Sequence, residues 1–101
     1  MDVRVAKCML LTKVLAADGI MTENERMVLD KAMAREKLAD AERKLVLDLE
    51  GWNDAEAIVA KLGEDERRAL LGELVEAASA DGRLSPLENA MLKQITASIG
   101  L

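Results

Sequence analysis

One eight-residue pattern, Asp-Gly-x-apolar-Ser/Thr-x-x-Glu, occurs twice in this chain and constrains its fold more than any other feature. The first copy extends from Asp18 to Glu25, and the second extends from Asp81 to Glu88, 63 residues further along. Each copy follows an apolar, alanine-rich segment and precedes a segment with apolar residues at helical spacing. The chain is therefore predicted to contain two related helix–turn–helix units joined by a middle segment.

Within each copy, the residue types indicate the end of one helix and the start of the next. A glycine after an apolar helical segment tolerates the positive φ of a helix C-terminal residue, so we expect Gly19 and Gly82 to lie at helix ends with φ above zero. Thr22 and Ser85 are expected N-cap residues, and the glutamate three residues later completes a capping box. The turns are short, so the flanking helices should pack as neighbours.

Composition supports the same fold class. Leucine and alanine dominate and aromatic residues make up only 1% of the chain, a balance that favours helices around an aliphatic core. We expect an all-α fold, with residues 1–101 as one domain and repeat units at about 2–36 and 64–99 related by a pseudo-twofold axis. Val75 and Leu87 are predicted core residues. The bundle should contain about six helices, near residues 2–17, 23–36, 40–49, 53–63, 64–80 and 86–99.

Local signals predict where the middle helices begin and end. Asp40 is a candidate N-cap for the third helix, and Gly51 is expected to stop that helix. Asn53 begins a second capping-box pattern, which predicts the start of the fourth helix. Gly63 is expected to end the fourth helix.

Charge and hydropathy limit the classes of partner. The chain has 14 basic and 19 acidic residues, a net charge of −5, and no basic stripe, so nucleic-acid binding is not expected. No apolar segment approaches the roughly 18 residues needed to span a membrane. The N-terminus does not fit a signal peptide, because Lys13 interrupts its apolar segment. We expect a cytoplasmic protein without direct membrane insertion.

The sequence offers little for catalysis. It contains no histidine, which excludes histidine-based triads and imidazole metal ligands. It also has no P-loop and no GxGxxG motif. We therefore expect no enzymatic activity, with an unrecognised carboxylate enzyme as a less favoured alternative.

The acidic residues of the repeat are the candidate functional site. Asp18, Glu25, Asp81 and Glu88 occupy equivalent places in the two units, and they could converge if the units pack about a pseudo-twofold axis. Clustered carboxylates repel one another unless a cation or basic group neutralises them. Oxygen-only ligands suit calcium, magnesium or manganese. The alternative is that these acids serve only as helix caps.

Two further side chains have competing interpretations. Cys8 is the sole cysteine, so it cannot form an internal disulfide, and a small core residue is favoured over a reactive thiol. Trp52 is the sole aromatic residue. It could cap the aliphatic core or anchor a partner, since tryptophan is enriched at interface hot spots.

The paired motifs Ala17-Asp18-Gly19 to Glu25 and Ala80-Asp81-Gly82 to Glu88 resemble those of the TerB-like family, as does the ending Ile99-Gly100-Leu101. That family includes tellurite-resistance TerB proteins and the N-terminal domain of a membrane-anchored DnaJ-type co-chaperone. The resemblance implies an all-helical bundle, acidic positions that bind metal, and association with stress-response or membrane-proximal complexes.

The sequence therefore predicts a non-enzymatic TerB-like interaction module. It is expected to bind a divalent cation through Asp18, Glu25, Asp81 and Glu88 and to act with a protein partner, a homodimer being one option. The alternative is a pure protein-binding adaptor whose acidic residues are helix caps.

Overall fold

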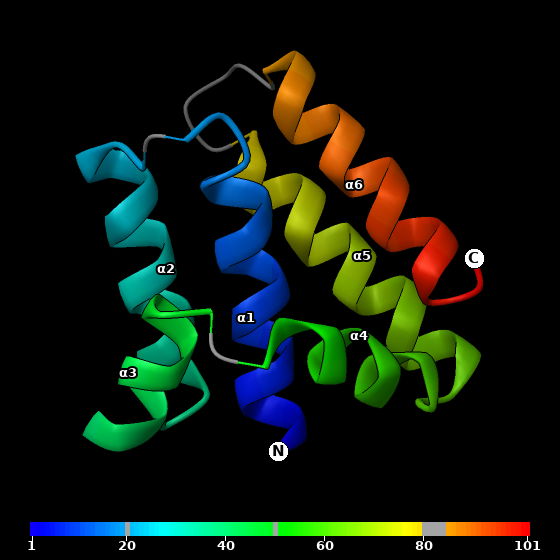
Figure 1. The fold of residues 1–101 in the computed structure, drawn as a ribbon, viewed down its shortest axis with the longest axis horizontal. Helices are drawn as coiled ribbons and strands as arrows, with labels where there is room; N and C mark the ends of the chain where they lie inside the picture. Colours follow the sequence, from blue (N-terminus) through cyan, green and yellow to red (C-terminus); the bar gives the residue numbers. More distant parts are fainter. Residues whose placement is uncertain (20, 50, 80–84) are drawn as a thin grey trace.

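Six α-helices and no strand are present in the parts of the chain that the computed structural model describes, which are residues 1–19, 21–49, 51–79 and 85–101. The all-α prediction is confirmed (Figure 1). The helices are α1 (Val3–Leu15), α2 (Glu23–Arg35), α3 (Asp40–Leu47), α4 (Trp52–Ala60), α5 (Glu64–Ala78) and α6 (Pro86–Ser98).

Helix α1 is the central element of the bundle, and it contacts each of the other five helices. Its second half is apolar on nearly every side, and Met9, Leu10 and Leu15 are completely buried. A helix that is apolar all round must be covered on all sides to be stable. Thr12, a polar residue in this buried stretch, donates its hydroxyl to the carbonyl of Cys8 at 2.9 Å.

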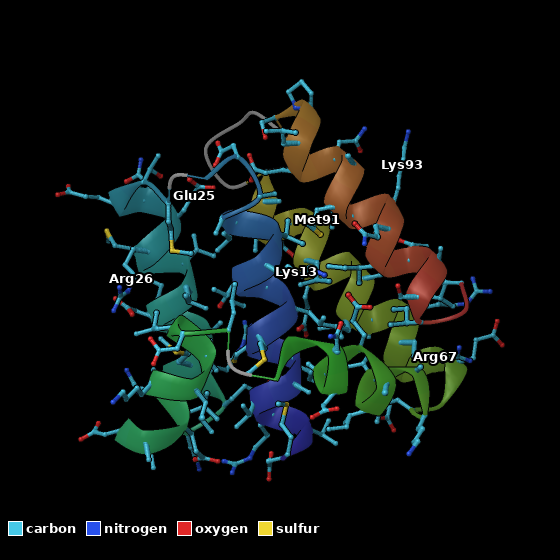
Figure 2. All side chains as sticks on the ribbon, in the orientation of Figure 1. Lys13, Glu25, Arg26, Arg67, Met91 and Lys93 are labelled. Carbon is cyan, nitrogen blue, oxygen red and sulfur yellow. The ribbon has the colours of Figure 1, made fainter. Side chains whose placement is uncertain are left out.

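The middle segment, α3 and α4, packs against α1. Val46 of α3 and Ala55 and Val59 of α4 are buried in the core. The Lys13 ammonium of α1 lies 3.0 Å from a carboxylate oxygen of Glu56 in α4, with side-chain exposures of only 12% and 16%. This shielded ion pair fixes α4 beside α1 (Figure 2), since shielding from water strengthens the attraction between opposite charges.

The second helices of the two repeat units have matching ends. α2 and α6 each begin after a Thr or Ser N-cap with a complete capping box, as predicted. They also end alike: the Leu38 amide donates to Met33 O at 3.1 Å and the Leu101 amide donates to Thr96 O at 3.0 Å. Both are Schellman-type endings.

A pair of arginines, which the sequence analysis did not identify, extends this correspondence. Arg4 Nη1 donates to Glu36 O at 2.9 Å, and Arg67 Nη1 donates to Ile99 O at 2.6 Å. Donor and acceptor are both shifted by the 63 residues that separate the repeats. Each guanidinium thus joins the first helix of its unit to the C-terminal carbonyl of the second, where a cation is favourable. The pseudo-twofold relation of the two units in space remains a prediction.

Several predicted helix ends in the middle segment are wrong. Ala39, not Asp40, is the N-cap of α3, which ends at Leu47 before reaching Gly51. Gly51 instead precedes α4 as its N-cap with φ of 79°, so Asn53 lies inside that helix. Gly63 is the N-cap of α5 rather than the end of α4. Residue types that favour a helix end and residue types that favour a helix start lie close together in these turns. The backbone conformation of each turn decides which residue ends one helix and which caps the next.

Two predicted core residues lie on the surface. Val75 is 43% exposed and Leu87 is 56% exposed. In both helices, other apolar residues form the face that packs in the core. Apolar periodicity alone therefore predicts a wider buried face than the one that the structure has. Trp52 begins α4, but its side chain is outside the described part of the chain, and so are Gly82 and Asp81.

The substitution Gly19→Ala should lower the free energy of unfolding by on the order of 1 kcal/mol, because Gly19 has φ of 85° and alanine is strained there. No atom lies within 4 Å of an added Cβ, so the cost is purely backbone strain. The control is Gly72→Ala within α5, which also meets open space. It should stabilise by about 0.8 kcal/mol, because alanine has the higher helix propensity. Urea denaturation measures the change in unfolding free energy for each variant. If both substitutions stabilise or both destabilise the protein, the positive φ assigned to Gly19 is contradicted.

The substitution Arg67→Met should remove the bond to Ile99 O and lower stability by about 1 kcal/mol. The loss of stability is moderated because Nε of Arg67 is buried without a hydrogen-bond partner among the described residues. Removing this group also removes the free-energy cost of burying it. Arg26→Met is the matched control, since Arg26 pairs only with Asp30 on the exposed face of α2. The control should change stability by less than roughly 0.5 kcal/mol. A thermal melt in which both variants behave alike would refute the role of Arg67.

Candidate functional site

Three of the four predicted site residues lie in described parts of the two turns. Asp18 is exposed in the turn between α1 and α2, where Gly19 has the predicted positive φ. Glu25 and Glu88 are the third residues of α2 and α6. Asp81, the fourth predicted ligand, lies outside the described residues.

Glu25 is positioned by the capping box at the start of α2. Its backbone amide donates to the Thr22 hydroxyl at 3.2 Å, and its Oε1 accepts from the Thr22 amide at 3.0 Å. The side chain is half-buried at the top of α2 (Figure 2). The cap accounts for one of its two carboxylate oxygens and fixes the direction of the side chain.

Glu88 makes the same cap in a buried setting. Its amide donates to the Ser85 hydroxyl at 3.1 Å, and its Oε1 accepts from the Ser85 amide at 3.3 Å. The residue is only 5% exposed. Its other oxygen, Oε2, is buried and has no hydrogen-bond partner among the described residues. A buried carboxylate oxygen without a partner is costly, so this atom requires an explanation.

Glu88 lies within electrostatic reach of two acids of the first repeat unit. Burial raises the pKa of Glu88, and the negative charges of Glu25 and Asp18 raise this pKa further. The hydrogen bonds from Ser85 act in the opposite direction and favour the ionised form. Acids that are far apart in the sequence therefore influence the pKa of Glu88, while the convergence of all four predicted site residues remains a prediction. Asp18 is itself engaged in an interaction, so it is not simply a free surface charge.

The described acids do not form a preassembled metal site. Within residues 1–19, 21–49, 51–79 and 85–101, no group of three or more Asp, Glu or Cys side chains is arranged to hold a metal ion. Glu25 and Asp18 are each within electrostatic reach of Glu88, but these acids are not grouped as metal ligands. A bound cation would have to draw these side chains together.

The two equivalent glutamates differ in a way that the repeat in the sequence does not predict. Glu25 and Glu88 share one motif and one capping role, yet Glu88 is buried, with one oxygen that has no hydrogen-bond partner among the described residues, and Glu25 is half-buried. Motif matching gives no signal for this, because burial depends on which helices pack over each turn. For Cys8 the favoured interpretation is confirmed: the thiol is buried, and burial raises its pKa to about 11, which disfavours the reactive thiolate.

A family model described as "Tellurite resistance protein TerB" matches residues 4–101. The chain belongs to the TerB family. The match includes both helix–turn–helix units and all four predicted acidic positions. This membership suggests a tellurite-resistance-associated domain. No curated protein and no solved structure was found to match the chain.

The prediction that the chain has no membrane-spanning segment concerns the helices of this TerB domain that the structure describes. None of them combines the length and the apolar character that crossing a bilayer would require.

The substitution Glu88→Gln should raise the melting temperature at neutral pH in the presence of a chelator. Gln keeps the acceptor that caps α6 but removes a buried negative charge. The folded-state pKa of Glu88 is raised, so protonation favours folding: stability is full below the unfolded pKa and declines as pH rises through the folded value. The advantage of Gln should therefore appear at neutral pH and vanish in acid. Glu25→Gln, at the half-buried equivalent position, is the control and should show a smaller effect. A melting difference independent of pH would contradict the assignment.

Proposed function

We propose that this TerB domain is a non-enzymatic interaction module that binds a divalent cation between its paired acidic turns and serves in tellurite or related stress resistance, or in membrane-proximal complexes. The observation that carries the proposal is the buried Oε2 of Glu88, which has no partner among the described residues. A cation would remove the cost of this orphaned oxygen, and it would also relieve the repulsion from Glu25 and Asp18.

The chemistry of the acidic residues defines the kind of ion. Glu88 Oε2 would supply the inner ligand, Glu25 and Asp18 would approach from the first turn, and Asp81 would contribute from the second. All four offer only carboxylate oxygen, which suits hard cations such as calcium, magnesium or manganese. Both glutamates already use Oε1 in their capping boxes, so each retains one oxygen for an ion.

A pure protein-binding adaptor is the second candidate, because both capping boxes are complete. Capping accounts for Oε1 of Glu25 and Glu88 and would make these acids structural. It does not account for the buried Oε2 of Glu88. Cation binding explains both glutamates, and for this reason we favour it.

The remaining parts of the proposal concern activity and location. The absence of histidine from the sequence supports a role without general acid–base catalysis by imidazole. An enzyme using only carboxylates is the less favoured alternative, because Glu25 and Glu88 are held by caps that restrict their movement. We place the domain in the cytoplasm, with a protein as its partner.

Thermal melting with added cation tests the site. The melting temperature should rise with calcium, magnesium or manganese, because an ion that prefers the folded state stabilises it. At 100 times the dissociation constant, the expected gain is about 2.7 kcal/mol. Asp18→Asn combined with Asp81→Asn should abolish most of this gain. Asp48→Asn combined with Asp65→Asn, two exposed acids outside the repeat motifs, is the control of equal charge and should retain it.

Isothermal titration calorimetry then separates specific binding from general screening of charge. The wild-type protein should bind one ion with saturation, and the paired-turn variant should not. Melting curves that stay flat up to millimolar concentrations of all three cations would exclude the cation site. The adaptor function, with the acids as caps, would then be the supported alternative.

A further inference from the structure

A groove between α2 and α5, above α1, extends away from the proposed cation site and shares only Glu25 with it among the described residues. It consists of one hollow of about 260 Å³ and an adjoining hollow of about 200 Å³. The two hollows share Val28, Lys31 and Ala77. None of the described side chains of α3 and α4 lines either hollow, and both helices pack against α1 elsewhere.

The groove has the length of a short helix. Along α2 its lining extends from Asn24 to Glu36, which corresponds to roughly 18 Å at 1.5 Å per helical residue. That is about three turns of helix. Its floor and inner walls are apolar, with Leu11 from α1 and Leu70 and Leu74 from α5. An elongated apolar trough of this kind is typical of sites that bind amphipathic helices.

The two edges of the groove carry opposite charges. Lys31 and Arg35 stand one turn apart on α2, and Glu73 and Glu76 stand one turn apart on α5. None of these four side chains takes part in an ion pair or side-chain hydrogen bond within the described part of the chain. Glu25 and Glu36 also line the α2 edge, near its two ends. The α2 edge is therefore basic in its middle, at Lys31 and Arg35, and the α5 edge is acidic.

The repeat indicates what such a groove accepts. A shift by 63 residues relates α2 to α6 and relates α5 to α1. Under the predicted pseudo-twofold relation, the surface that corresponds to the groove is bordered by α6 and α1, and α4 packs against both of these helices. The residue that corresponds to Glu76 is Lys13, and it pairs with Glu56 of α4 at 3.0 Å. A helix with a charge matched to the edge already occupies the equivalent surface.

We propose that the groove between α2 and α5 binds an amphipathic helix of a partner protein, with acidic residues along the flank facing Lys31 and Arg35 and basic residues along the flank facing Glu73 and Glu76. Because the flanks differ in charge, the edges also fix the direction in which the helix lies. This inference goes beyond the cation site and does not depend on it.

Helix-stapled peptides that copy residues 52–62 of α4 provide the probe, because they carry an apolar ridge formed by Ala55, Ile58, Val59 and Leu62. Three versions differ only at positions 56 and 61, on opposite flanks of the ridge: the natural Glu and Lys, Lys at both, or Glu at both. The mixed peptide should bind the wild-type protein roughly tenfold more tightly than either uniform peptide, because each uniform peptide meets one edge of like charge.

Charge reversal in the protein should change the preferred peptide. With Lys31→Glu and Arg35→Glu both edges become acidic, and the peptide with two lysines should bind best. With Glu73→Lys and Glu76→Lys both edges become basic, and the peptide with two glutamates should bind best. Lys44→Glu with Lys93→Glu, two exposed lysines that do not line the groove, alters net charge equally and should leave the mixed peptide preferred. Circular dichroism checks that each variant is folded. The reversal on α2 and the reversal on α5 test the proposal independently of each other.

Three results would overturn the proposal. The first is that no peptide binds the wild-type protein at millimolar concentration. The second is that the order of affinities is the same for both reversed variants and the control. The third is a wild-type dimer in sedimentation velocity that either reversed variant dissociates, since a second copy of this chain would then occupy the groove.

Discussion

Burial of α1 on nearly every side is the constraint on which the rest of the structure depends. Its second half has almost no polar face to leave in water, so the other helices must be arranged around it. α5 and α6 repeat the pattern of the first two helices, and α3 and α4 add cover that the repeat does not provide. The shielded pair of Lys13 and Glu56 fixes part of this cover. The groove between α2 and α5 lies over a part of α1 that includes Cys8 and Leu11.

The two repeat units resemble each other in the hydrogen bonds at their helix ends. Each unit uses a Thr or Ser cap with a glutamate at the start of its second helix, and an arginine at its end. Orphan amides and carbonyls at these ends are satisfied by the same residue types in both units. One difference is informative: Lys37 has a φ of 57° where the second unit has Gly100. The repeat tolerates a strained lysine there because the Schellman-type bonds around it are complete.

The two proposed sites share helix α2. Glu25 caps this helix beside the acidic turns and also lines the smaller hollow of the groove, while Lys31 and Arg35 lie about two and three helical turns further along α2. A cation at the turns and a helix in the groove would thus contact the same helix. The buried Oε2 of Glu88 belongs only to the first site, so the two can be disrupted separately.

The sequence by itself determined the all-α class, the positive φ of Gly19 and the capping boxes at Thr22 and Ser85, because these features depend on residues close together in the chain. It did not show whether Gly51 and Gly63 each end the preceding helix or cap the following one. It also did not show that Val75 and Leu87 lie outside the buried faces of their helices. Only the tertiary structure decided that Glu88 is buried while its equivalent Glu25 is half-buried, and that basic and acidic edges face each other across a groove. Local patterns specify hydrogen bonds within a turn, whereas burial and the meeting of charges depend on which helices pack together from distant parts of the chain.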